Sequence, residues 1–393
     1  MSNSARLSFR QYFHLPALSA GFTSVLIGYS SSAVIIFQAA KAAGASTDQI
    51  GSWMMALGIG MGLTTLGLSW RYKMPIITAW STPGAALLVT SLQGISLPEA
   101  IGAFVFSAVL ITLSGITGWF EKAMDRIPIP LAAAMLAGVL FKFGIDAFLS
   151  LESQFGLVLL MFVVYLVARK IIQRYTILLV LITGLIVCQF QGLLDFSSFT
   201  PAINAPELVV PEFSLTALIG VGIPLFVVTM VSQNIPGIAV LRTAGYAAPI
   251  SPMISWTGIA TLILAPFGGF AINLAAITAA ICTSPEAHVD SSKRYIAGLS
   301  TGVCYLLLGI FGSAIAALFA AFPVEFVLAL AGLALLSTIA NSLYTAVSDS
   351  ASREAAVITF VVTASGISLF GIGAAFWGLV AGVIANFVFT RKK

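Results

Sequence analysis

The chain has 393 residues, of which 59% are hydrophobic and only 8% charged, and its formal net charge is +4. Soluble domains carry roughly 25% charged residues. Together with a mean hydropathy of +1.05, these values exclude an ordinary soluble enzyme, a disordered chain and a small disulfide scaffold. They predict an all-α polytopic membrane protein.

Apolar runs separated by charged residues predict fourteen transmembrane segments. A spanning helix needs about 20 largely apolar residues, and the length of the chain accommodates this number. Numbered from 1 to 14 in chain order, the predicted spans cover residues 15–40, 48–70, 75–91, 98–120, 128–146, 153–168, 175–193, 213–240, 249–267, 273–289, 294–320, 325–345, 354–370 and 373–390.

The basic residues sort to one side of this topology, as cytoplasmic loops require. With the N-terminus inside, all but two of the 18 Lys and Arg residues fall on inside segments. The exceptions are Lys41 on an outside loop and Lys142 within span 5, which either snorkels or pairs, or has a functional role. We therefore expect a multi-pass membrane protein with N- and C-termini in the cytoplasm.

Two halves of the chain resemble each other at an offset near 200 residues. Residues 77–79 and 81–85 (ITA and STPGA) recur as residues 277–279 and 283–287 (ITA and TSPEA). The proline-containing stretch 192–212 divides the halves, which predicts a first repeat over residues 1–200 and a second over 201–393. Seven spans per half is an odd number, so the second half enters from the opposite side, as in inverted-repeat transporters.

Spans 3 and 10 contain a hydroxyl residue followed by proline near their middle, Thr82-Pro83 and Ser284-Pro285. This pair is typical of a helix start. We therefore predict extended segments over 75–80 and 275–282, which could pair with each other, and half-helices over 82–91 and 284–290. The alternative is that both prolines only kink continuous helices.

The predicted topology directs both half-helix N-termini at one central point of the membrane. Each N-terminus carries partial positive charge and free N–H groups. The two ends therefore predict a site for an anion or an acceptor-rich polar ligand.

Glu286 is the one acidic residue that this topology places inside the membrane. A charge at that depth costs about 3 kcal/mol, so the residue either caps the half-helix or carries a proton beside the substrate. Desolvation and the helix dipole act in opposite directions on its pKa, and both ionisation states stay open.

Span 8 carries the polar run Ser232-Gln233-Asn234, and span 1 carries Tyr29-Ser30-Ser31-Ser32 at the equivalent place. Buried amides and hydroxyls need partners. They therefore either bind a ligand or join helices by hydrogen bonds.

Several other classes of function lack support in the sequence. The three cysteines and two histidines have no metal-binding spacing, so no metal or cofactor is predicted. The chain contains no catalytic constellation, which indicates that it is not an enzyme. The positive charge follows the membrane topology and does not indicate binding to nucleic acid.

These motifs resemble the benzoate:proton symporter (BenE) family over nearly the whole chain. The resemblance is carried by YSSSA (29–33), TAWSTPGAA (78–86), SQN (232–234) with PG (236–237), AITAAIC (276–282) with SPEAH (284–288), and ASG (364–366) with GL (378–379). It implies proton-coupled uptake of benzoate across an inner membrane and the 7+7 inverted-repeat fold of the nucleobase transporters. In those relatives spans 8 and 10 present carboxylates, whose matching positions are Gln233 and Glu286.

The departure at Gln233, an amide in place of an acid, fits an anionic substrate better than a neutral nucleobase. We expect spans 1–4 and 8–11 to form a core domain that moves against a gate domain of spans 5–7 and 12–14. Glu286 is expected to carry the coupling proton. The predicted substrate-binding residues are Ser31, Ser81, Thr82, Gly84, Gln233, Asn234, Thr283, Ser284 and Glu286.

The expected function is uptake of benzoate or a related aromatic carboxylate with protons, by alternating access in the lipid bilayer. A nucleobase or inorganic-anion carrier on the same fold is the first alternative, and a channel or a membrane enzyme is a more distant one. The sequence leaves the stoichiometry open and is compatible with a homodimer.

Overall fold

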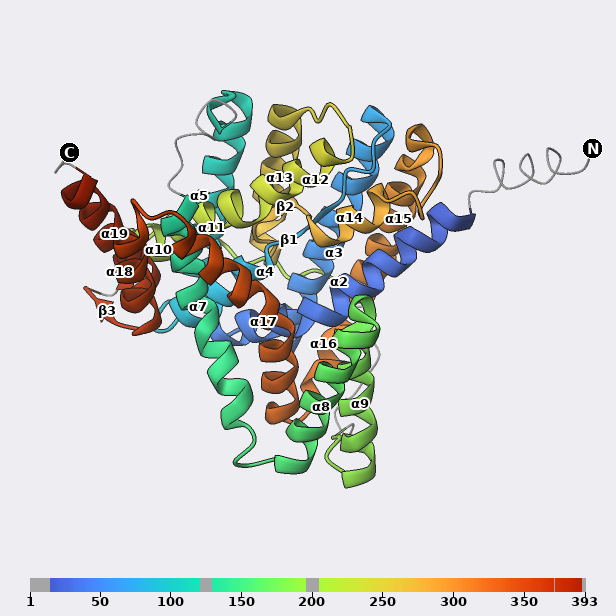
Figure 1. Cartoon of the computed structure of the whole chain (residues 1–393), viewed down its shortest axis with the longest axis horizontal. Helices are drawn as coiled ribbons and strands as arrows, with labels where there is room; N and C mark the ends of the chain where they lie inside the picture. Colours follow the sequence, from blue (N-terminus) through green and yellow to red (C-terminus); the bar gives the residue numbers. More distant parts are fainter. Residues whose placement is uncertain (1–14, 121–128, 196–204, 371, 391–393) are drawn as a thin grey trace, which may run out of the picture.

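The computed structural model describes residues 15–120, 129–195, 205–370 and 372–390. The middle of the predicted linker and the basic residues of both tails and of the 121–128 loop lie outside this range. The described chain is almost entirely helical (Figure 1).

The first half contains seven α-helices, one short strand and one 3₁₀ turn among the described residues. Their bounds are α2 (Leu15–Ala42), α3 (Thr47–Tyr72), β1 (Thr78–Trp80), α4 (Thr82–Ser91), α5 (Leu97–Ile116), α7 (Ile129–Leu149), α8 (Phe155–Ile171), η2 (Gln173–Tyr175) and α9 (Thr176–Gln191).

The second half begins with one long helix that is interrupted by two π turns. Its parts are α10 (Leu215–Ala217), η3 (Leu218–Gly222), α11 (Ile223–Thr229), η4 (Met230–Asn234) and α12 (Ile235–Thr243). The elements that follow are α13 (Ile250–Leu264), η5 (Ala265–Phe267), β2 (Ile272–Leu274), α14 (Ile277–Thr283), η6 (Ser291–Lys293), α15 (Tyr295–Ile310), α16 (Gly312–Ala320), α17 (Val324–Ser348), α18 (Arg353–Ala364), β3 (Ser368–Leu369), β4 (Ile372–Gly373) and α19 (Ala374–Thr390).

Each of the fourteen predicted spans overlaps a helix of the structure, but they are not all continuous. Six described helices are long and apolar enough to cross a membrane alone, or up to eight if each bent pair counts as one span. Span 11 bends by 65° between α15 and α16, and span 1 bends by 43° after Ser30. Span 13 was predicted as one helix over 354–370, but α18 ends at Ala364 and a β3–β4 hairpin follows. The number of crossings and the inverted repeat stay predictions.

Strands β1 and β2 confirm that extended segments from distant parts of the chain pair in the interior. They run antiparallel, with Ala79 opposite Asn273. The Thr78 N–H donates a hydrogen bond of 3.0 Å to the Thr65 hydroxyl on α3, and the Trp80 N–H donates to Met61 Sδ at 3.0 Å. Open backbone at membrane depth is tolerated only when protein groups satisfy it, and these contacts meet that need.

The predicted start of the first half-helix is almost correct. Helix α4 covers residues 82–91 as expected, but its N-cap is Ser81, one residue before Thr82. The Ser81 hydroxyl accepts a hydrogen bond of 3.0 Å from the Gly84 N–H, and Pro83 follows inside the first turn, where its missing N–H costs nothing.

The predicted start of the second half-helix is wrong. Helix α14 already begins at Ile277, and it ends at Thr283 where the prediction had extended backbone. Ser284 is extended, with φ −72° and ψ 155°. Proline disfavours helical backbone in the residue before it, so Pro285 here ends a helix. The extended segment of this half is β2, residues 272–274, and not 275–282.

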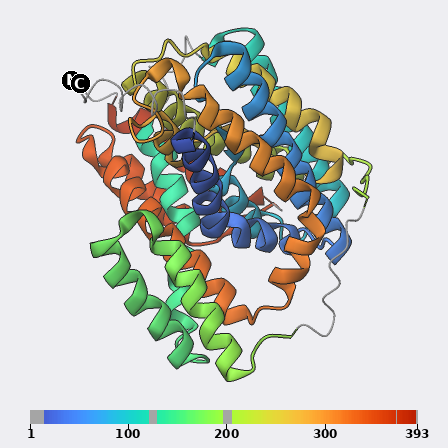
Figure 2. The same ribbon diagram turned by 90° about the vertical axis from the view of Figure 1, so that its right-hand side faces the viewer.

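Small residues allow the helices to pack closely. A methyl group on Gly58 of α3 would lie 2.4 Å from the Cα of Gly309 on α15, so the two backbones are in contact there. On the other side, α17 packs along α7, where a methyl group on Gly332 would lie 2.4 Å from the Phe143 carbonyl. Figure 2 shows the α8–α9 hairpin (green) at the opposite edge from α3 and α15 (blue and orange).

Candidate functional site

A cavity of about 920 Å³, here called the large cavity, lies between two groups of helices. One wall comes from α2, β1, α4, η4, α14 and α15, and the other from α7, α8, α9 and α17. The first set of elements belongs to predicted spans 1, 3, 8, 10 and 11, and the second to predicted spans 5, 6, 7 and 12. The movement of a core against a gate stays a prediction. Binding sites for small molecules typically measure about 300 to 1,000 Å³, and the large cavity is of this size.

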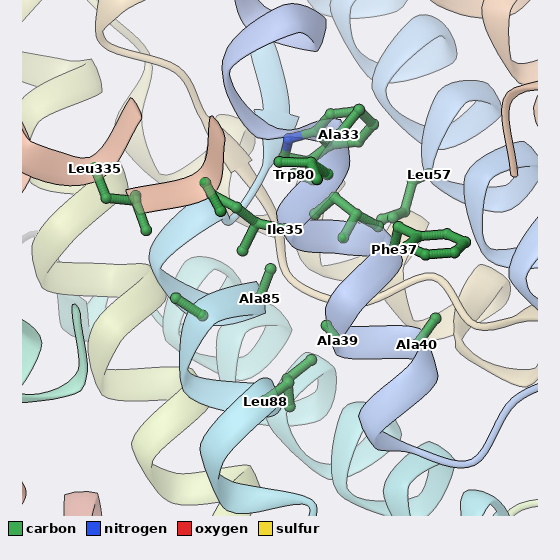
Figure 3. Packing of buried hydrophobic residues seen from close by; sticks show 14 of the residues in the cluster. Ala33, Ile35, Phe37, Ala39, Ala40, Leu57, Trp80, Ala85, Leu88 and Leu335 are labelled. Carbon is green, nitrogen blue, oxygen red and sulfur yellow. The ribbon is translucent and has the colours of Figure 1, made fainter. Parts of the chain in front are cut away.

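Three aromatic side chains meet on the first wall. The rings of Tyr29 and Trp80 lie edge to face with centroids 4.6 Å apart, and Tyr305 lies 6.2 Å from Tyr29. The indole Nε1 of Trp80 donates a hydrogen bond of 2.8 Å to the Ser32 hydroxyl, which fixes the ring. Figure 3 shows Trp80 beside α2, above the packed apolar residues Ile35 and Ala85. The cavity therefore offers a flat aromatic surface to a ring-shaped ligand.

One hydroxyl on this wall, Tyr29 Oη, is buried without a hydrogen-bond partner, whereas the Thr278 hydroxyl is within hydrogen-bonding reach of Tyr305. Tyr29 and Thr278 both line the large cavity. Buried polar atoms in folded proteins nearly always have partners. The Tyr29 hydroxyl is therefore available to donate a hydrogen bond to a ligand in the cavity.

The N-terminus of α4 opens into the large cavity through Thr82 and Pro83. Its cap, Ser81, is fully buried and holds the Gly84 N–H. Gly84 is also buried, and a methyl group at its Cα would lie 2.8 Å from both Leu225 Cδ1 and Ser81 Oγ. Ser81 and Gly84 thus shape the helix end, while Thr82 presents the positive end of the helix dipole to the cavity.

Strand β2 leads into the same space from the other side. Residues 275–278 line the large cavity, and α14 begins there without a side-chain cap. The Ala275 N–H donates a hydrogen bond of 2.9 Å to the Ile77 carbonyl, so the two strand ends are held together. The starts of α4 at Thr82 and of α14 at Ile277 thus both line the large cavity, whereas the second start was predicted at Ser284.

The amides of span 8 separate into two roles. Gln233 and Ser232 line the large cavity. Asn234 is fully buried, and its Oδ1 accepts a hydrogen bond of 2.9 Å from the Leu274 N–H of β2. The Asn234 amide nitrogen contacts Met230 Sδ at 3.2 Å. Asn234 was predicted to bind substrate, but in the structure it positions the strand.

Three predicted residues lie away from the large cavity. Thr283 and Ser284 at the end of α14 donate their hydroxyl hydrogens to the carbonyls of Ala280 and Ile281. Glu286 is exposed in the turn that follows. The expectation that this acid is buried is therefore wrong. The error comes from the wrong start of the second half-helix. The prediction placed Glu286 in the first turn of a helix that begins at Ser284, whereas in the structure Glu286 follows the last turn of α14.

The turn that contains Glu286 is held by a buried arginine. Arg294 donates to the Thr283 carbonyl through Nη1 at 2.8 Å and to the His288 carbonyl through Nε at 2.7 Å. In the following loop, the hydroxyl and N–H of Ser292 donate to Asp290 at 2.7 and 2.9 Å. These hydrogen bonds lower the pKa of the Asp290 carboxyl.

Ser31 lies within α2, and its side chain is outside the described residues. Its neighbours Ser30 and Ser32 line the large cavity. The site prediction omitted Thr278, Tyr305 and Arg169, which also line it. Thr278 lies in the recurring ITA motif but was interpreted as extended backbone, Tyr305 lies in an apolar helical run without a local motif, and the basic pair Arg169-Lys170 was interpreted only as a loop signal.

Arg169 on α8 is the one charged residue among the described residues that line the large cavity. It is exposed and lies near Gln173 at the mouth. No group of three or more possible metal ligands occurs among the residues that the structure covers. The site therefore combines an aromatic wall, a helix N-terminus and one guanidinium group.

Comparison with known proteins identifies the family of this chain. The family model described as benzoate membrane transport protein, BenE, matches residues 11–388. The chain belongs to the BenE family. This BenE protein is 52% identical over 384 residues to the inner membrane protein YdcO of Escherichia coli (strain K12), covering 96% of this chain and 98% of that protein. It is 42% identical to the benzoate membrane transport protein of Acinetobacter baylyi (strain ATCC 33305 / BD413 / ADP1), covering 98% of each chain.

Solved structures show the fold of this BenE protein. The transmembrane domain of the cyanobacterial bicarbonate transporter BicA matches with a TM-score of 0.62 and 13% identity, covering 97% of this chain and 98% of that chain. The murine anion transporter Slc26a9 matches with a TM-score of 0.57 and 13% identity, covering 97% of this chain and 69% of that chain. The BenE protein is thus a membrane transporter and not an enzyme.

Proposed function

We propose that this BenE protein carries benzoate, or a closely related aromatic carboxylate, through the large cavity by alternating access. The observation that carries the proposal is the meeting of an aromatic wall and the unpartnered Tyr29 hydroxyl with a helix N-terminus at one cavity. Benzoate has a flat apolar ring and an acceptor-only carboxylate, and each part finds a matching surface there.

In the proposed complex, the substrate ring stacks beside Trp80 and Tyr29. Its carboxylate accepts a hydrogen bond from the Tyr29 hydroxyl and lies near the N-terminus of α4. Gln233 donates from the π turn and orients the carboxylate. A π turn in a long helix is often found at a functional site, and here it brings Gln233 to the cavity.

The geometry supports a state that is open to the cytoplasm. The lining residues Arg169, Gln173 and Thr176 lie at or beside the cluster of basic residues that the charge distribution assigns to the inside. We propose that the core (spans 1–4 and 8–11) moves against the gate (spans 5–7 and 12–14), because the cavity walls divide between these two sets. The inverted repeat over 1–200 and 201–393 and the cytoplasmic termini belong to the same proposal.

Proton coupling is a further part of the proposal. We assign the coupling proton to Glu286, as the sequence suggested, although its exposed position lies outside the cavity lining. From there it cannot meet the substrate directly. It would act on the turn that Arg294 ties to the end of α14, so that its protonation biases the movement of that helix.

The test is uptake of radiolabelled benzoate into proteoliposomes, with and without an inward proton gradient. Saturable uptake that rises with the gradient is the expected result. Competition with uracil, xanthine, sulfate and bicarbonate separates an aromatic-acid carrier from a nucleobase or inorganic-anion carrier. If a nucleobase or sulfate competes and benzoate does not, the proposed substrate is wrong. Current without saturation would indicate a channel.

A further inference from the structure

A second cavity of about 280 Å³, here called the small cavity, lies along the same seam between the two groups of helices. Four elements line both cavities with different residues. On α7, Leu136 faces the large cavity and Lys142 the small one. On α2 the corresponding residues are Tyr29 and Lys41. Helices α4 and α17 contribute in the same way, so the two cavities are stacked end to end.

A thin apolar layer, here called the barrier, separates the cavities. It consists of residues 33–36, 85–88, 137–140 and 329–332, which are all buried. Figure 3 shows Ile35 of α2 and Ala85 of α4 in this layer. Lys142 follows Leu136 by six positions on α7, which is a rise of roughly 9 Å along the helix. The small cavity therefore lies directly across the barrier from the site proposed for the substrate.

The chemistry of the small cavity suits an aromatic anion. Lys41 and Lys142 line it, and the Lys41 ammonium lies 4.8 Å from the centre of the Phe37 ring. Phe143 and Phe319 add further aromatic surface. Asp146 lies one turn from Lys142 on α7 and offsets part of the charge, which leaves one positive charge in excess.

Gln38 also lines the small cavity. Its side-chain oxygen is an acceptor and cannot bond a carboxylate, so the attraction for an anion comes from the two lysines. Lys41 and Lys142 are also the two basic residues that do not sort to the inside. Simple anchoring of Lys142 at a membrane surface explains its position but not the convergence of a second lysine and four phenylalanines on one cavity.

We propose that the small cavity is a second binding site for the aromatic carboxylate, on the face opposite the large cavity. There Lys41 and Lys142 capture the anion before the barrier opens. This inference rests on the proposed function, and it adds a site to it. Lys41 and Lys142 act on entry from one face only, because each lies beyond the barrier from the large cavity.

The experiment compares benzoate uptake in right-side-out and inside-out membrane vesicles for the wild type, Lys41→Gln and Lys142→Gln. We expect each substitution to raise the KM for uptake from the small-cavity face roughly threefold, the effect of losing one exposed charge contact, with kcat unchanged. The KM from the large-cavity face should not change. Lys142→Arg, which keeps the charge, should restore the KM of the wild type.

Lys170→Gln serves as the control, because it removes the same charge from α8 and Lys170 lines neither cavity. Equal KM values for the wild type and both variants from both faces would overturn the inference while the proposed function stands. An equal rise from both faces would also overturn it, because it would indicate a general loss of fold. Absence of benzoate transport by the wild type from either face would remove the proposed function and the second site together.

Discussion

The Leu274 N–H donates a hydrogen bond to Asn234 Oδ1 at 2.9 Å, and this contact joins strand β2 to the π turn η4. Asn234 is fully buried, so no water replaces it. In Asn234→Ala the Leu274 N–H loses its acceptor, which costs about 1 to 3 kcal/mol. We expect a lower Tm in detergent and a loss of transport that benzoate addition does not recover. An unchanged Tm would contradict the positioning role.

The neighbouring residue Gln233 should behave differently, because it lines the large cavity. We expect Gln233→Ala to raise the KM for benzoate roughly tenfold, the effect of one hydrogen bond to a charged group. The Tm without substrate should stay within error of the wild type. Measured side by side, the two substitutions distinguish a residue that stabilises strand β2 from one that contacts the substrate. A lower Tm in both variants would indicate that Gln233, like Asn234, has a structural role.

Tyr29→Phe removes a hydroxyl that is buried and unpartnered without ligand. The free protein should therefore be as stable as the wild type or slightly more stable. Benzoate should bind about tenfold more weakly, because its carboxylate loses a donor. Thr229→Val is the matched control, since its hydroxyl is also buried and unpartnered but does not line the cavity. Calorimetry on both variants gives the Kd for benzoate and the Tm. An unchanged Kd in Tyr29→Phe would show that the Tyr29 hydroxyl does not contact the substrate.

Gly84→Ala tests the shape of the α4 start. The added methyl group would lie 2.8 Å from Ser81 Oγ, so the cap has to move. We expect a destabilisation of about 1 to 3 kcal/mol from overpacking and weaker benzoate binding. Gly67→Ala is the control, because nothing lies within 4 Å of its added methyl group and alanine favours the helix. Thermal unfolding of the two variants gives the comparison, and equal stability would show that the cap tolerates the methyl group.

Glu286→Gln separates substrate binding from proton coupling. Because Glu286 is exposed and outside the cavity lining, we expect the Kd for benzoate at fixed pH to stay unchanged. The stimulation of uptake by a proton gradient should be lost. Glu354→Gln, which neutralises another exposed acid on α18, should keep the stimulation. Normal gradient dependence in Glu286→Gln would exclude Glu286 as the coupling residue.

Much of the fold could be predicted because hydrophobicity and charge act over long segments. The positions of the helices follow from apolar runs, and β1 follows from Thr82-Pro83 near a helix start. The second half shows the limit. Ser284-Pro285 has the same local pattern as Thr82-Pro83, yet proline stands in the first turn of α4 and just after the last residue of α14. Both positions satisfy the backbone rules of proline, and only tertiary packing decides between them.

The candidate site was predicted in outline and missed in detail for a related reason. Thr82 and Gln233 line the large cavity as expected, whereas Asn234 faces β2 instead. Adjacent polar residues on a helix point about 100° apart, so a polar run cannot have a single role. Thr278 lies in a recurring motif, but the motif does not say which side chain faces a ligand. Tyr305 carries no sequence signal, because a lone hydroxyl in an apolar helix is common and its meaning depends on what faces it.

The barrier has an electrical consequence. The barrier spans roughly 9 Å along α7, which is less than a third of a hydrocarbon layer of roughly 30 Å. If water and ions fill both cavities, the transmembrane voltage falls mainly across that short layer. A benzoate anion entering a cell with an interior potential of −100 mV would then meet an opposing energy of about 2.3 kcal/mol within this distance. A proton that crosses with it cancels this cost, so a one-to-one symport would be insensitive to voltage.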